Sequence, residues 1–122
     1  MLMQKSAEFN IDLNAKDNYA RTAFHRTFQN GHSKIVEMLM QKSAEFNIDL
    51  NAKDQGGETA FHWVCFSGKT DMVEIMIANA EASTIDLLAK DNHGSTGFQL
   101  AQEYGGREVV NLIETKMPSI AK

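Results

Sequence analysis

Cys65 and His62 are the two residues whose types and spacing best fit nucleophilic chemistry. Residues three apart in a helix lie on one face, where an imidazole can take the proton of a thiol and leave a reactive thiolate. The alternative is a structural role in a protein core for both residues. Cys65 is the only cysteine, so no internal disulfide can form and a reducing compartment, the cytoplasm, is expected.

Metal and phosphate sites are not indicated. No two of the four histidines stand three or four residues apart in a ligand pattern, so we expect no metal and no cofactor. The segment 105–107, Gly-Gly-Arg, lacks the preceding strand and the lysine of a phosphate-binding loop. The histidines are His25, His32, His62 and His93.

Composition describes an ordinary globular chain of one domain. The sequence has 122 residues, of which 43% are hydrophobic and 23% charged, with a net charge of −4. This charge argues against a nucleic-acid partner, which a basic stripe would attract. The longest apolar stretch, 61–66, is far below the roughly 20 residues of a membrane span, and the first residues lack the pattern of a secretory signal.

An internal repeat organises the chain. Residues 1–17 recur unchanged at 38–54, which gives a period of 37 residues. Thr-Ala-Phe-His at 22–25 recurs at 59–62 and, as Thr-Gly-Phe-Gln, at 96–99. Periods of this size are typical of stacked supersecondary units.

Each unit is predicted to hold two helices and an extended connection with a turn. Thr22, Thr59 and Thr96 are suitable N-caps for a first helix that ends at Gly31, Gly68 or Gly105. A second helix follows, because apolar residues recur at helical spacing in 35–40 and 72–77. The fold class is therefore all-α.

The segment 54–62, Asp-Gln-Gly-Gly-Glu-Thr-Ala-Phe-His, resembles the signature of the ankyrin-repeat family. The resemblance implies a solenoid of stacked helix-turn-helix units with extended connecting turns over residues 1–116. The units are a partial repeat end at 1–17, repeats at 18–54 and 55–91, and a C-terminal capping repeat at 92–116, followed by a tail at 117–122.

Three departures from the family pattern carry structural expectations. Each unit has about four extra residues, such as 45–48, which should lengthen the loop after the second helix. The family's proline is replaced by Ala23, Ala60 and Gly97. Ala20 stands where the other units have glycine, and a positive φ there would cost about 1 kcal/mol.

The two ends of the array differ. Gln102 and Glu114 replace apolar residues of the earlier units, which is typical of a terminal repeat. At the N-terminus, residues 1–5 are too few to cover the first repeat, so this edge could drive self-association. The unchanged copy of residues 1–17 favours recent duplication or a deliberately copied fragment of a longer array.

The resemblance also assigns single residues. It places Cys65 in a small buried slot and gives His25 and His62 a structural hydrogen bond with the preceding threonine. Asn14 and Asn51 stand in a context similar to that modified by asparaginyl hydroxylases, the alternative being hydrogen bonds to the loop backbone.

Function in the family is generally protein binding through a concave face, so the resemblance implies a non-enzymatic interaction module with a protein partner. The alternative is a spacer that only extends a longer solenoid. Trp63 is expected in the core, and Phe66 either in the contact surface or turned inward against Trp63. The expected contact residues are Tyr19, Arg21, Gln29, Asn30, Gln55, Glu58, Phe66, Ser67, His93, Ser95, Glu103 and Tyr104.

Overall fold

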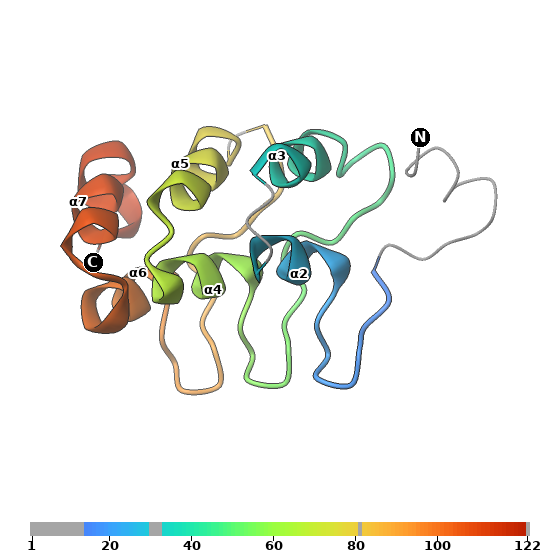
Figure 1. The fold of residues 1–122 in the computed structure, drawn as a ribbon, viewed down its shortest axis with the longest axis horizontal. Coiled ribbons are helices and arrows are strands. Elements are labelled where there is room, and N and C mark those ends of the chain that lie inside the picture. The colour runs from blue at the N-terminus through green and yellow to red at the C-terminus, as the bar shows by residue number, and fades with distance from the viewer. Residues whose placement is uncertain (1–13, 30–32, 81, 122) are drawn as a thin grey trace.

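The computed structural model describes residues 14–29, 33–80 and 82–121. Figure 1 shows three units in a row, each with a long turn, a first helix beside it and a second helix on the far side. The first helices are α2 (Ala23–Gln29), α4 (Ala60–Ser67) and α6 (Gly97–Leu100), the last continued by the π-helix η1 (Ala101–Gly105). The second helices are α3 (Ser33–Gln41), α5 (Thr70–Ala78) and α7 (Arg107–Lys116), and a 3-10 turn, η2 (Pro118–Ile120), follows. The described residues contain no strand, as the all-α prediction requires.

The first helices begin at the threonines that the sequence predicted. Thr59 and Thr96 have extended backbones, and each side chain accepts a hydrogen bond from the backbone N–H three residues later. The side chains of His62 and Gln99 reach back to the threonine N–H and complete a capping box. Helix α4 ends at Gly68, whose φ of 71° permits the left-handed C-cap.

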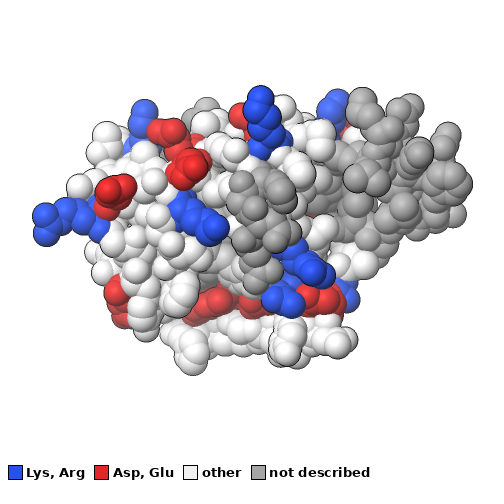
Figure 2. Space-filling model, viewed as in Figure 1, with Lys and Arg blue, Asp and Glu red and all other residues white. Residues whose placement is uncertain are grey.

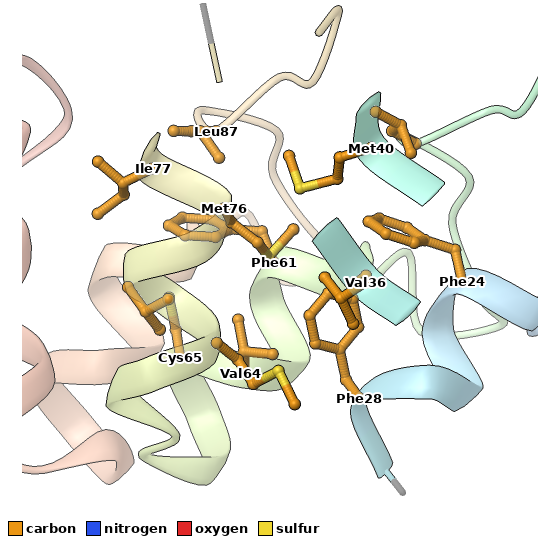
Figure 3. Packing of buried hydrophobic residues seen from close by; sticks show 14 of the residues in the cluster. Phe24, Phe28, Val36, Met40, Phe61, Val64, Cys65, Met76, Ile77 and Leu87 are labelled. Atoms are coloured by element: carbon orange, nitrogen blue, oxygen red, sulfur yellow. The ribbon is translucent and has the colours of Figure 1, made fainter. Parts of the chain in front are cut away.

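The core lies between the first and second helices and runs through all three units. Figure 3 shows Phe24 and Phe28 of α2 meeting Val36 and Met40 of α3, with Phe61 of α4 beside them. The rings of Phe24 and Phe28 pack edge to face with centroids 5.1 Å apart. Three methionines of the second helices are buried in this core: Met40, Met72 and Met76.

Each long turn is organised by an aspartate. The Oδ1 atom of Asp54 accepts hydrogen bonds of 2.9 Å from the N–H groups of Gly56 and Glu58. Asp17 and Asp91 do the same for the residues two and four positions later. These aspartates therefore fix the shape of the three turns from within.

The turn also needs a positive φ, which confirms the expectation for Ala20. Its φ is 63°, close to the 75° of Gly57 and the 79° of Gly94 at the equivalent positions. A Cβ atom disfavours this region, so the first turn carries a strain that the two glycine turns lack.

Hydrogen bonds that recur at the repeat spacing hold the units together. The backbone N–H of Gln55 donates to the Tyr19 carbonyl at 3.0 Å, and Asn92 donates to Gly56 at 3.0 Å. Lys16 donates to the Lys53 carbonyl at 3.1 Å, 37 residues away, and Lys53 donates to Lys90 in the same way at 2.9 Å. The hydrogen bonds between the first and second units are thus repeated between the second and third.

The four extra residues do more than lengthen a loop. Phe46 packs partly against the core, Ile48 is buried, and Asn47 between them has a φ of 55°. The inserted turn therefore extends the hydrophobic core beyond α3.

The C-terminal end is polar where the inner units are apolar. Gln102 and Glu114 are exposed, whereas Cys65 and Ile77 at the equivalent positions are buried. After α7, Ile120 turns back and is buried in the core, so the segment 117–121 packs against the array. Among the described residues, no helix is long and apolar enough to cross a bilayer.

Candidate functional site

The Cys65 and His62 pair lacks the geometry of a nucleophile and its base. Cys65 is fully buried, and this burial raises the pKa of its thiol. Both ring nitrogens of His62 are engaged, because Nδ1 accepts from the Thr59 N–H at 3.0 Å and Nε2 donates to the Ser95 carbonyl at 2.8 Å. The burial of Cys65 and the hydrogen bonds of His62 are therefore those of structural residues.

His25 repeats this arrangement one unit earlier. Its Nδ1 accepts from the Thr22 N–H at 3.2 Å and its Nε2 donates to the Glu58 carbonyl at 2.9 Å. Burial lowers the pKa of His25, although the Glu58 carbonyl opposes this shift. No group of three or more His, Cys, Asp or Glu residues in the described part of the chain is placed to hold a metal ion.

Asn14 and Asn51 connect neighbouring units through their side chains. Asn51 donates from Nδ2 to the Thr84 carbonyl at 2.9 Å, and its Oδ1 accepts from the Asp86 N–H at 2.6 Å. Asn14 makes the corresponding bonds to the Asn47 carbonyl and the Asp49 N–H, at 2.8 and 2.7 Å. The backbone-bonding role is thus present, and hydroxylation of either side chain stays a prediction.

Most of the predicted contact residues lie on one face, made of the turn tips and the exposed sides of the first helices, which we call the turn face. Tyr19, Phe66 and Tyr104 are 60%, 51% and 61% exposed, so Phe66 is not turned into the core. Gln55, Ser67, His93 and Glu103 are also exposed, and Arg21, Glu58 and Ser95 are partly buried. Gln29 lies in α2, and Asn30 lies outside the described residues.

Aromatic and guanidinium groups form a line across the turn face. The Arg21 guanidinium lies 4.9 Å from the Tyr19 ring centroid and 5.8 Å from that of Trp63. Farther along, the rings of Phe66 and Tyr104 have centroids 5.0 Å apart. The line thus spans all three units.

Between these two groups the surface is hollowed. An open hollow of about 350 Å³ is lined by one or more members of each group and by two carboxylates. The lining residues are Arg21, Asp54, Glu58, Trp63, Phe66 and Ser67.

Trp63 is the site residue that the sequence assigned to the core. It is only partly buried, and its Nε1–H donates to Asp54 Oδ2 at 2.9 Å. The His25 ring lies beside the indole, with centroids 5.2 Å apart. The sequence feature that could have indicated this position is Asp54, nine residues earlier, because its carboxylate can accept a hydrogen bond from the indole nitrogen and hold the ring at the surface.

Charge on the turn face is mainly acidic. In Figure 2, acidic side chains form a row along the side of the molecule that carries the turns, with basic side chains beside them at the right-hand end of the row. Asp17 pairs with Arg21 at 2.8 Å, and hydrogen bonds from the Arg21 and Tyr19 backbone help to lower the pKa of Asp17. Burial, and then the charges of Asp54 and Asp91, raise the pKa of Glu58.

A larger open hollow of about 600 Å³ lies between α5 and α7, on the opposite layer of the stack. Its walls are polar or charged except for Leu112, with three carboxylates and the ammonium group of Lys116, and no aromatic ring lines it. Because interface energy concentrates on aromatic and arginine side chains, the smaller hollow has the better chemistry for recognition.

Comparison with known proteins agrees with this architecture. Residues 46–119 match the family model of ankyrin repeats in three copies. The chain therefore belongs to the ankyrin-repeat family, whose domains are generally protein-binding modules and typically non-catalytic. A comparison with curated proteins gave no match.

Proposed function

We propose that this chain is a non-enzymatic module that binds another protein through its turn face. The observation that carries the proposal is the line of exposed and half-buried aromatic groups across all three units, from Tyr19 to Tyr104. Folding alone gives no reason to expose such large rings in one line, whereas a partner that covers them would gain from their burial.

Rigidity of the backbone beneath these groups supports the same function. The three turns are fixed internally by their aspartates and joined to one another by hydrogen bonds such as that from Asn92 to Gly56. A surface that is already ordered loses little conformational entropy when a partner binds. The single cysteine is a free, buried thiol, which is typical of proteins in a reducing compartment, so the proposed place of binding is the cytoplasm.

A pull-down tests the proposal. The bait proteins are the unaltered chain, a Tyr19→Ala, Phe66→Ala, Tyr104→Ala variant, and an Ile35→Ala, Met38→Ala control on α3, where both side chains are 40% exposed. We expect a protein retained by the unaltered chain and the control and lost by the turn-face variant. Circular dichroism verifies that all three remain helical.

The spacer alternative makes the opposite prediction. If the chain only extends a longer solenoid, the turn-face variant and the unaltered chain retain the same proteins. That result would refute the proposed function.

A further inference from the structure

We infer that the partner inserts a basic side chain, arginine or lysine, into the hollow lined by Trp63, Phe66 and Glu58. This inference rests on the proposed function and names the chemistry of the residue that the turn face recognises. It follows from the walls of the hollow, from its charge and from the way its aromatic rings are held.

The walls of the hollow suit an alkyl stem that ends in a cation. Trp63 and Phe66 present aromatic surface, which attracts a cation and also packs against methylene groups. The indole of Trp63 is fixed by its hydrogen bond to Asp54, so the aromatic wall is ordered before a partner arrives.

The charge of the hollow also favours a cation. Asp54 and Glu58 line it, and the only cation in its wall, Arg21, is already paired with Asp17 at 2.8 Å. Counting Asp17, three carboxylates face one guanidinium. An acidic partner would approach Arg21 beside the Asp17, Asp54 and Glu58 carboxylates, whereas a basic one meets an excess of negative charge.

Glu58 is the carboxylate best placed to receive that cation. Asp54 already accepts two backbone N–H groups and the Trp63 indole, whereas no lysine or arginine in the described residues forms an ion pair with Glu58. Glu58 is partly buried, and this burial, followed by the charges of Asp54 and Asp91, raises its pKa, whereas the charge of His93 opposes the shift. A partner cation would add an attraction at a carboxylate that now has two negative neighbours.

The experiment begins with a selection of random peptides displayed on phage against the unaltered chain. Dissociation constants of the selected peptides are then measured from the fluorescence of Trp63, the single tryptophan. Glu58→Gln removes the charge and keeps the shape, and Glu74→Gln on α5 is the matched control on the opposite layer. Proton–nitrogen correlation spectra verify that both variants keep the fold.

We expect the selected peptides to share an arginine or lysine whose replacement by norleucine weakens binding about tenfold. Glu58→Gln should weaken binding of the basic peptide about fivefold. It should leave binding of the norleucine peptide unaffected, because that peptide has already lost the cation with which the Glu58 carboxylate interacts. Glu74→Gln should change neither dissociation constant.

Two kinds of failure are distinguishable. The first failure concerns peptides that do not bind the Tyr19→Ala, Phe66→Ala, Tyr104→Ala variant. If these peptides carry acidic or uncharged residues, or if Glu58→Gln does not change their affinity, the basic-residue inference is wrong and the proposed function is still supported. If no peptide is enriched, or if every enriched peptide binds that variant unchanged, the inference and the proposed function fail together.

Discussion

The Nε2–H of His62 donates a 2.8 Å hydrogen bond to the carbonyl oxygen of Ser95, so a buried side chain of one unit holds the turn of the next. His25 and Glu58 repeat this relationship with a distance of 2.9 Å. Glu58 lines the proposed binding hollow. The hydrogen bond from His25 to the Glu58 carbonyl therefore joins two units and also positions the turn that carries the Glu58 carboxylate.

Two substitutions at His62 should separate its local and long-range roles. His62→Ala leaves the buried Thr59 N–H without its side-chain acceptor and removes one of the two donors to the Ser95 carbonyl, which also accepts from the Asp91 N–H, so we expect the free energy of unfolding to fall by about 2–3 kcal/mol. His62→Gln keeps the cap, as Gln99 does with Thr96 at 2.9 Å, and should lose about 1 kcal/mol less. Urea unfolding followed by circular dichroism measures both, and equal losses would show that the cap contributes nothing.

Stability should depend on pH through His25. Burial lowers its pKa below the 6.5 of an unfolded chain, so the unfolded state binds more protons as the pH falls through 6.5. The contribution of neutral His25 is therefore complete above that pH and is lost progressively below it. Between pH 7.5 and 5.5, the free energy of unfolding should fall more for the unaltered chain than for His25→Gln; parallel profiles would contradict this.

The three turns offer a matched set of substitutions at the position of positive φ. Ala20→Gly should stabilise the protein by about 0.5–1 kcal/mol, since it removes the strain at φ 63°. Gly94→Ala should cost about 1 kcal/mol, because open space surrounds the added methyl group. Gly57→Ala should cost about 2–4 kcal/mol, because its Cβ would also meet the backbone nitrogen of Asn92 at 2.8 Å and the Asn92 Oδ1 atom.

Thermal unfolding of these three variants gives the comparison. The difference between Gly57→Ala and Gly94→Ala isolates the contact between neighbouring turns from the backbone strain that both share. Equal costs at the two positions would mean that the turns do not press against each other in solution.

Much of the fold could be predicted because its local interactions recur with the repeat. The threonine caps, the buried histidines and the positive φ at Ala20 depend on residues a few positions apart, and each appears in more than one unit. Among the described residues, a π-helix occurs once, over Ala101–Gly105. There a Cβ on Gly105 would overlap the Cys65 carbonyl oxygen, a contact between units that no local pattern contains.

The candidate site was harder to predict because it depends on contacts that only one pair of units makes. The aromatic residues Tyr19, at a turn tip, and Phe66 and Tyr104, on the first helices, were identifiable from their places in the repeat. The position of Trp63 depends on Asp54, on the His25 ring and on Arg21, which come together only when the first two units stack. Tryptophan occurs once in the chain, so no second copy revealed its surface role.

Thiol chemistry provides a further prediction. Because Cys65 is buried and its thiol pKa is raised, we expect the folded protein to react with an aromatic disulfide reagent far more slowly than the urea-unfolded chain. The absorbance of the released thiolate follows the reaction. Rapid labelling of the folded protein would restore the Cys65 and His62 pair as a candidate for catalysis.

Contact with a partner can be detected directly at the turn face by placing a photoreactive benzoylphenylalanine at position 66, and in a control at position 38 on α3. Irradiation in a cell lysate, followed by mass spectrometry, identifies what each position touches. If the turn face binds a protein, position 66 forms a discrete adduct that position 38 does not form and that the Tyr19→Ala, Tyr104→Ala background diminishes. Adducts that are the same from both positions, or that appear only from position 38, would contradict binding through the turn face.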